Sequence, residues 1–259
     1  MIIMKFDNEL SIIQQKIANG YAGVSRRLSI MNSLDIEIGQ NVIDIGCGGG
    51  HLVQEIALGV GEKGKSIGID PSKDQLEAAN GRCKNLNNVE LICCTADKIN
   101  IENNFCDRIT STQTLEYIED VDSSLKELKR ISKKNSKFVN VSILWDYFRF
   151  YGPEKKLNDI IHEAFRAHCF HQMLPLDLVG KLSNLGYQNI KSENLSYLIT
   201  NRDENSPAIF YEKMLAKFAV SQGVEQNKVI DWQNQIGKSE KEKKFGFTSF
   251  PVLTSAYLV

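Results

Sequence analysis

The stretch that decides the fold is Val42-Ile43-Asp44-Ile45-Gly46-Cys47-Gly48-Gly49-Gly50. Residues 41–45 form a short β-branched run, four of the next five positions are glycine, and residues 51–58 carry apolar side chains at helical spacing. This order predicts a strand, a glycine-rich turn and a helix. Because glycine lacks a Cβ atom and accepts positive φ angles, such a turn lets the backbone approach a ligand closely. The helix that follows would present its N-terminus, which attracts negative charge.

The same strand and helix alternation continues along the chain. Strands are predicted at residues 41–45, 65–70, 89–95, 107–112, 137–144, 188–199 and 247–258. Helices are predicted as two within residues 8–34, then at residues 51–58, 72–83, 113–134 and 174–185, with two more in 207–237 and a largely aromatic, helical segment at 145–172. Alternation of this kind implies parallel strands covered by helices on both faces. The prediction is an α/β fold with a doubly wound, seven-stranded, mostly parallel sheet, in a single domain over residues 1–259.

Charge and composition exclude several classes of protein. The chain has 31 basic and 32 acidic residues, a net charge of −1, which disfavours a nucleic-acid partner. Its six cysteines lack disulfide-framework spacing and contain no C-x-x-C pair, so reduced thiols are expected and no metal site. The longest uncharged stretch, residues 246–259, is too short and polar for a membrane span. With no secretory signal in the first residues, we expect a cytoplasmic protein. The charged run at 238–244 is interpreted as a solvated turn.

The glycine turn departs from the dinucleotide-binding rule. The third glycine of G-x-G-x-x-G would fall at His51, whereas Asp44-x-Gly46-x-Gly48-x-Gly50 is filled without a gap. That spacing, with Asp70 closing the next strand, resembles motif I of the class I S-adenosylmethionine-dependent methyltransferases. Within that family the chain most resembles the small-molecule branch typified by ubiquinone- and menaquinone-type C-methyltransferases. The resemblance implies a Rossmann-like methyltransferase fold and S-adenosyl-L-methionine as cofactor.

The resemblance also implies which residues hold the cofactor. They follow the ends of successive strands and are Asp44, Gly46, Cys47, Gly48, Asp70, Pro71, Ala96, Asp97 and Gln113, with Arg27 upstream. Asp70 would accept hydrogen bonds from the ribose hydroxyls. Asp97 would accept one from the adenine amino group, and Arg26 or Arg27 would reach the methionyl carboxylate.

Each of these assignments has a simpler alternative. Asp44 is otherwise a carboxylate that stabilises the turn, Asp70 a helix cap, and Asp97 an ordinary loop acid. Arg26 and Arg27 are otherwise solvated helix charges. Where the branch often has Leu-Glu-His after strand four, this chain has Tyr117 in place of the histidine.

Two observations narrow the class of methyl acceptor: the motifs that the chain lacks, and the position of an aromatic segment in the predicted fold. The chain lacks both the Asn/Asp-Pro-Pro-Tyr/Phe turn of amino-group methyltransferases and the Pro-Cys nucleophile of cytosine C5 methyltransferases. The aromatic run at 145–151 follows strand five, at the sheet edge where α/β ligand sites form. Tyr147, Phe150 and Tyr151 are therefore candidate acceptor contacts, the alternative being a packed core. His168 and His171 are candidate catalytic bases, because histidine titrates near neutral pH, or else structural histidines.

The function expected is transfer of a methyl group from S-adenosylmethionine to a small, aromatic or apolar metabolite. Residues 35–144 would bind the cofactor, and helical segments at 8–34, 145–172 and 200–240 would form a lid over the acceptor. Two alternatives stay open. One is a protein that uses the cofactor as a scaffold, without methylation or as a lyase, and the other is a nicotinamide oxidoreductase.

Overall fold

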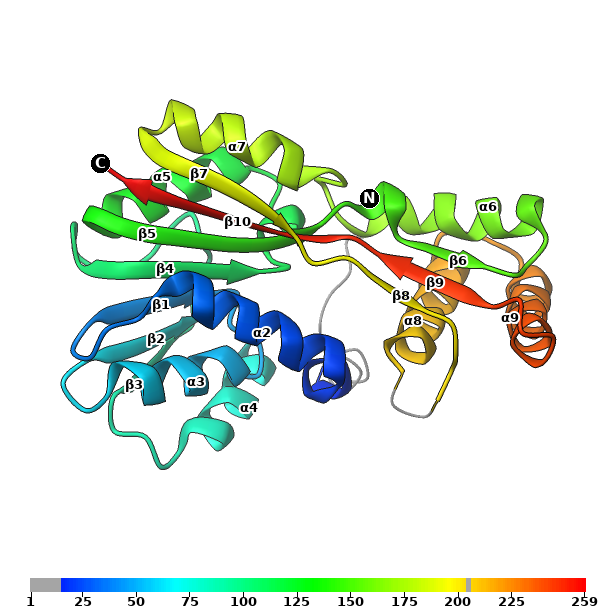
Figure 1. The fold of residues 1–259 in the computed structure, drawn as a ribbon, viewed down its shortest axis with the longest axis horizontal. Helices are drawn as coiled ribbons and strands as arrows, with labels where there is room; N and C mark the ends of the chain where they lie inside the picture. Colours follow the sequence, from blue (N-terminus) through cyan, green and yellow to red (C-terminus); the bar gives the residue numbers. More distant parts are fainter. Residues whose placement is uncertain (1–14, 204–205) are drawn as a thin grey trace.

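The computed structural model describes residues 15–203 and 206–259, arranged as two lobes joined by extended strands (Figure 1). The first lobe is built on a seven-stranded sheet with the order β3-β2-β1-β4-β5-β10-β7. Its strands are β1 (Asn41–Ile45), β2 (Lys65–Ile69), β3 (Val89–Ile92), β4 (Cys106–Thr112), β5 (Ser132–Ile143), β7 (Tyr187–Asn194) and β10 (Pro251–Leu258). The first five strands pair in parallel, and β10 runs antiparallel between β5 and β7. The predicted seven-stranded, mostly parallel sheet is confirmed.

The register of the central strands brings three turns to one edge of the sheet. Ile45 at the end of β1 lies opposite Ile69 of β2 and Ser111 of β4. The residues that follow these strands therefore leave the sheet side by side. This edge is where open parallel sheets form ligand sites.

Helices cover both faces of the sheet, as predicted. On one face lie α2 (Tyr21–Leu34), α3 (His51–Val60) and α4 (Lys73–Cys83), and on the other α5 (Val121–Ile131) and α7 (Leu174–Asn184) (Figure 1). Ile30 and Leu34 of α2 and Ile56 of α3 pack with strand residues into one apolar cluster. On the opposite face, α5 and α7 bury leucines against β1, β4 and β10. Two helices were expected in residues 8–34, and α2 is the second of them. Of the first, residues 8–14 lie outside the described residues, and residues 15–19 are helical up to Gly20.

The second lobe contains a sheet that the sequence analysis did not predict. Its strands are β6 (Arg149–Tyr151), β9 (Gly246–Ser249) and β8 (Tyr197–Ile199), antiparallel with β9 in the middle. Helices α6 (Lys155–Phe165), α8 (Pro207–Ser221) and α9 (Gln226–Lys241) accompany it, with short 3-10 turns η2 (Trp145–Tyr147) and η3 (Arg166–His168). Only β6 lies within a segment predicted as helical, residues 145–172, whereas β8 and β9 belong to the predicted strands at 188–199 and 247–258. The core of the lobe is an aromatic cluster that includes Phe148, Phe150 and Trp232.

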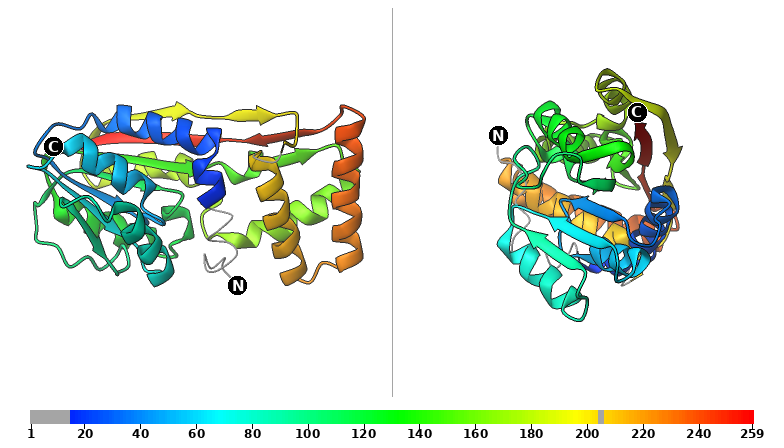
Figure 2. Two further views of the ribbon diagram at one scale, coloured as in Figure 1. Left: turned by 90° about the horizontal axis from the view of Figure 1, so that it is seen from below. Right: turned by 90° about the vertical axis from the view of Figure 1, so that its left-hand side faces the viewer.

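Two strands predicted as single units are each divided between the two sheets. Residues 187–199 form β7 and then β8, and residues 246–258 form β9 and then β10. Asn194 Oδ1 accepts a hydrogen bond from Ser196 N at 2.8 Å at the first break, and Pro251, which has no amide hydrogen, marks the second. Figure 2 shows both extended segments, in yellow and red, running along the two lobes. They connect the two sheets through continuous backbone.

Two further boundaries differ from the prediction. Residues 113–134 are not one helix, because a 3-10 turn, η1 (Leu115–Tyr117), precedes α5. Asp120 caps α5 by accepting a hydrogen bond from Ser123 N at 2.9 Å, which sets the start of the helix. The run at 238–244 is not all turn, since α9 continues through Lys241.

The buried amide of Asn158 ties the second lobe together and generates a prediction. Its Oδ1 accepts from Trp232 Nε1 at 2.9 Å, and its Nδ2 donates to the Phe150 carbonyl at 2.7 Å. Asn158→Ala should lower the free energy of unfolding by about 2–5 kcal/mol, because two buried polar groups lose their partners. Urea unfolding measures this loss, with the exposed Asn227→Ala on α9 as a control expected to stay within about 0.5 kcal/mol. A loss below about 1 kcal/mol would contradict the structural role of this amide.

Candidate functional site

Two adjoining cavities open at the carboxyl ends of β1, β2 and β4. They share lining residues Gly46, Gly48, Thr112, Gln113 and Tyr117. The larger cavity has a volume of about 780 Å³ and extends past the ends of β2 and β3. The smaller one extends toward α2 and α8. The shared residues make them two parts of one site.

The glycine turn forms the floor of this site. Gly46, Gly48 and Gly50 have φ angles of 69°, 51° and 75°, the left-handed region that favours glycine. A Cβ atom on Gly46 would lie 2.1 Å from Thr114 Oγ1, and one on Gly50 would lie 2.7 Å from Ala79 Cβ. The amides of Gly46 and Cys47 donate to the Ile69 carbonyl at 2.7 and 3.0 Å, which fixes the turn against β2. Glycine is thus required at positions 46 and 50 by conformation and by space.

Two carboxyl groups flank the turn. Asp70 accepts hydrogen bonds from Gly48 N and from Ser72 N, both at 2.9 Å, so it links the glycine turn to the start of α4. Ser72, whose side chain accepts from Gln75 N, is the residue that caps α4. Each oxygen of Asp70 keeps lone-pair capacity for a further hydrogen bond. Burial raises the pKa of Asp70, while its two backbone hydrogen bonds lower it.

Asp44 lies beneath the turn with no hydrogen-bond partner for Oδ1 among the described residues. Asp44 is buried, with only 3% of its surface exposed. Burial raises the pKa of Asp44 well above its usual range, and the nearby charge of Asp70 adds to the effect. An orphaned carboxyl oxygen facing a cavity is a feature that a bound ligand would satisfy.

All ten residues predicted to hold the cofactor line these cavities. Those on the smaller cavity alone are Arg27, Asp44 and Cys47; those on the larger alone are Asp70, Pro71, Ala96 and Asp97; those on both are Gly46, Gly48 and Gln113. The structure therefore brings together residues that the sequence predicted from five separate segments.

The two arginines of α2 have different environments. Arg27 Nε pairs with Glu55 Oε1 at 2.7 Å, and its Nη1 donates to the Ala18 carbonyl at 2.6 Å. Arg26 Nη1 donates to Gln113 Oε1, and its Nε is buried without a partner among the described residues. Gln113 itself has a φ of 49°, an uncommon conformation for a residue with a side chain.

The predicted acceptor contacts lie away from the two cavities. Phe150 is fully buried, with its ring centroid 5.4 Å from that of Trp232 and 4.6 Å from that of Phe247. Tyr147 and Tyr151 are about half exposed and line neither cavity. The reason is that residues 149–151 form a strand, so Phe150 faces the core while its neighbours face outward. The alternative of a packed aromatic core is what the structure shows for Phe150.

The two candidate bases also lie off the site. His168 is fully buried, stacked on Phe165 with ring centroids 4.0 Å apart, and its Nδ1 donates to the Phe165 carbonyl at 2.7 Å. Burial lowers the pKa of His168 to about 3. His171 Nε2 donates to the Ile118 carbonyl at 2.9 Å and the Glu119 carbonyl at 3.2 Å. Neither histidine lines either of these two cavities, so this geometry supports structural roles for both.

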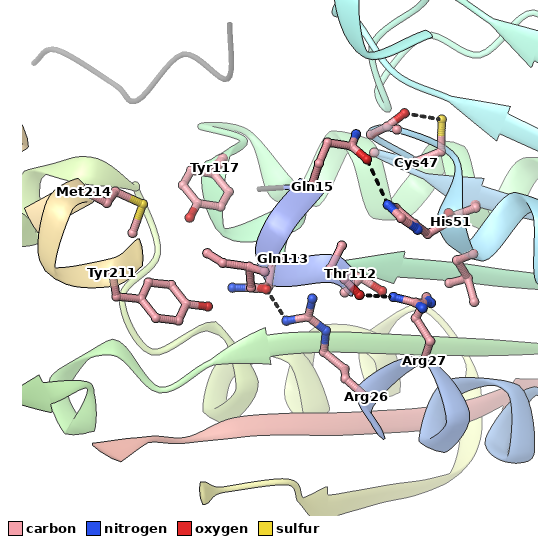
Figure 3. A pocket seen from close by; sticks show the side chains of 17 residues that line it. Gln15, Arg26, Arg27, Cys47, His51, Thr112, Gln113, Tyr117, Tyr211 and Met214 are labelled. Carbon is pink, nitrogen blue, oxygen red and sulfur yellow. Dashed lines mark hydrogen bonds between the residues drawn. The ribbon is translucent and has the colours of Figure 1, made fainter. Parts of the chain in front are cut away.

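The sequence analysis missed one wall of the smaller cavity, which η1 and α8 form. Tyr117 from η1 and Tyr211 and Met214 from α8 line the smaller cavity, and Figure 3 shows them across from Gln113 and Arg26. The substitution of tyrosine for histidine at position 117 was the available signal. Tyr211 and Met214 fall within a predicted lid helix, but nothing in their local pattern separates them from core residues.

Gln15 and His51 close the opposite side of the smaller cavity. His51 Nε2 donates to Gln15 Oε1 at 2.8 Å, and Arg82 Nη2 donates to the same oxygen at 2.9 Å. Burial, with the charges of Arg82 and Arg27, lowers the pKa of His51 to about 4. The imidazole is therefore neutral at physiological pH.

Comparison with known proteins identifies the family. Residues 36–203, more than half of the chain, match the family model of a methyltransferase domain. This range contains the glycine turn, Asp70 and Gln113. The chain belongs to this methyltransferase family. The predicted fold class and the predicted family are both confirmed.

Two curated relatives match the chain at low sequence identity. A demethylmenaquinone methyltransferase of Oceanobacillus iheyensis is 26% identical over 193 residues, 70% of this chain and 78% of the relative. An uncharacterised 37.1 kDa protein in transposon TN4556 of Streptomyces fradiae is 25% identical over 174 residues, 67% of this chain and 49% of the relative. The chain thus spans about half the length of that second relative.

A solved structure supports the fold. Phosphoethanolamine N-methyltransferase 2 of Haemonchus contortus, in complex with S-adenosyl-L-methionine, aligns with a TM-score of 0.64 and 17% identity, covering 97% of this chain and 57% of that one. Within residues 15–203 and 206–259, no helix has the length and apolarity needed to cross a bilayer.

A buried glutamate behind the site generates a pH prediction. Glu116 Oε2 accepts from Ser142 Oγ at 2.9 Å, and burial raises the pKa of Glu116 from 4.5 to about 7. Between these two values the native state binds a proton that the unfolded chain has released, so the free energy of unfolding falls as the pH rises. Relative to Glu116→Gln, the native protein should lose roughly 3 kcal/mol between pH 4.5 and 7.5.

Urea unfolding of both proteins across this pH range measures the difference. The exposed Glu62→Gln, in the turn before β2, is the matched control and should leave the pH profile unchanged. Parallel stability curves for the native protein and Glu116→Gln would show that the carboxyl of Glu116 does not titrate abnormally.

Proposed function

We propose that this chain is a cytoplasmic enzyme that transfers a methyl group from S-adenosyl-L-methionine to a small acceptor with an aromatic or apolar body. The observation that carries the proposal is the convergence of all ten predicted cofactor residues on one pair of connected cavities. Family membership supports the reaction class. Residues 35–144 would act as the cofactor-binding core, and α2 with the second lobe would form the acceptor side.

The residues present fit S-adenosylmethionine in their chemistry. Asp70 offers carboxylate lone pairs at the strand end where a ribose would be held. Ala96 and Asp97 line the far part of the larger cavity and would contact the adenine. The left-handed backbone at Gly46 and Gly48 leaves that floor free of side chains, and Asp44 has an orphaned oxygen facing it.

The acceptor side is proposed for the wall formed by Tyr117, Tyr211 and Met214. Tyr211 and Met214 are on successive turns of α8. Aromatic faces and a thioether suit a planar or apolar body, and aromatic faces also attract a neighbouring cation. This wall replaces Tyr147, Phe150 and Tyr151 as the candidate acceptor contacts.

The chain's contribution to the reaction would be positioning. When bound, S-adenosylmethionine supplies an already activated methyl group on a sulfonium. The protein then has to hold the acceptor against that group and exclude water, and such alignment can supply about 7–11 kcal/mol without a side-chain nucleophile. Gln113 and Tyr117, which line both cavities, occupy the junction where this alignment would occur.

The role of Asp70 in cofactor binding can be tested by Asp70→Asn. This change removes the charge but keeps one acceptor oxygen, so S-adenosylhomocysteine should bind about 10- to 100-fold more weakly, the effect of losing hydrogen bonds to a charged group. Isothermal titration calorimetry measures the affinity. Asp74→Asn, exposed in the first turn of α4, is the matched control and should bind as the native protein does. Unchanged affinity in a folded Asp70→Asn would remove Asp70 from the cofactor site.

A labelling experiment that follows the methyl group distinguishes methyl transfer from a role in which the cofactor serves only as a scaffold. The full chain incubated with methyl-labelled S-adenosylmethionine and a metabolite extract should yield a labelled product. Product formed without label, with the cofactor recovered intact, would favour the scaffold alternative. Binding of NADH in preference to S-adenosylhomocysteine would favour the oxidoreductase alternative.

A further inference from the structure

The Arg26 side chain is a cation with no ion pair among the described residues, although it lines the smaller cavity. Its Nη1 is held by Gln113 Oε1, and its Nε is buried without a partner in the described chain. Its neighbour Arg27, by contrast, is neutralised by Glu55 at 2.7 Å. A partly buried guanidinium without a counter-charge is costly unless a ligand supplies one.

Two acidic groups at or beside the smaller cavity, Glu116 and Asp44, form no ion pair with Arg26. The charge of Arg26 lowers the pKa of Glu116, but burial has the larger effect and raises that pKa to about 7. Glu116 Oε2 accepts its hydrogen bond from Ser142 Oγ. Asp44 lines the same cavity, and burial raises its pKa well above the usual range. Both carboxyl groups therefore favour the neutral form more than an ordinary acid does. Within the described residues, the Arg26 guanidinium therefore lines the cavity without an ion-pair partner.

The direction of Arg26 assigns it to the acceptor side. Figure 3 shows the Arg26 guanidinium beside the Gln113 amide and turned toward the Tyr211 hydroxyl, whereas Arg27 lies toward His51. The groups across the cavity from Arg26 are Tyr117, Tyr211 and Met214, an aromatic and apolar wall. The surroundings thus combine one cation with an apolar surface.

We propose that Arg26, oriented by Gln113, binds an anionic oxygen of the methyl acceptor, so that the acceptor is an organic anion with an aromatic or apolar body. This inference rests on the proposed function, because it assumes that the larger cavity and the glycine turn hold the cofactor. The planar guanidinium fork matches a carboxylate or a similar oxyanion, and it would fix the acceptor's orientation at the junction of the cavities. The same chemistry could come from the cofactor's own carboxylate, and the experiment separates the two sources.

The experiment measures binding of paired probes to the full chain saturated with S-adenosylhomocysteine. The pairs are benzoate with benzamide and octanoate with octanamide, which differ in charge but share a body. In the native protein at least one anion should bind tenfold or more tightly than its amide. Arg26→Met should abolish that preference, and Arg26→Lys, which keeps the charge but loses the fork, should retain part of it. Arg166→Met, at an arginine that lines neither cavity, is the matched control and should behave as the native protein.

A second set of measurements compares the affinity for S-adenosylhomocysteine with that for 5′-methylthioadenosine, which lacks the amino-acid part. Arg26→Met should change the affinity for each by less than threefold. A tenfold or greater loss for S-adenosylhomocysteine alone would overturn the inference and assign Arg26 to the cofactor's carboxylate. Absence of any anion preference in the native protein would also overturn it. If the native protein binds no S-adenosylhomocysteine, the proposed function fails, and the inference fails with it.

Discussion

The left-handed backbone between β1 and α3 is the constraint on which the site depends. Because Gly46 and Gly50 pack without side chains against Thr114 and Ala79, the turn draws β4 and α4 close to β1. Asp70 then reaches the Gly48 amide and links β2 to the same turn. One local conformation therefore fixes the relative positions of four elements, and both cavities take their shape from it.

The second lobe shapes the site through packing. Its interior is filled with aromatic rings, among them Phe148, Phe150 and Trp232, whose burial leaves α8 in a defined position. Tyr211 and Met214 of α8 belong to this core and also line the smaller cavity. Few residues of the second lobe therefore line the acceptor side. Most of its aromatic residues instead stabilise the position of α8, which carries Tyr211 and Met214.

The sequence predicted best where function depends on local chemistry. Gly46, Gly48 and Asp70 could be assigned because a glycine turn and a strand-end acid have a physical meaning within a short segment. Tyr211 could not, because its place depends on how α8 packs. The prediction of acceptor contacts in the aromatic run at 145–151 failed for a related reason. Residues 149–151 form a strand, in which successive side chains point to opposite faces, and this alternation decides which ring is buried. The division of the last strand escaped prediction because residues 247–258 form one stretch without a charged residue, in which only Pro251 marks the break.

The position of β9 and β10 has a consequence for the order of assembly. β9 is the middle strand of the small sheet, and β10 lies between β5 and β7 in the large one, so residues 246–258 complete both sheets at once. Until these residues have left the ribosome, β7 has no partner on the side of β5, and β6 and β8 cannot pair with each other through β9. Contacts between such distant parts of a chain form slowly. During synthesis, the parallel strands β1 to β5 can therefore assemble first, and the acceptor side is finished last.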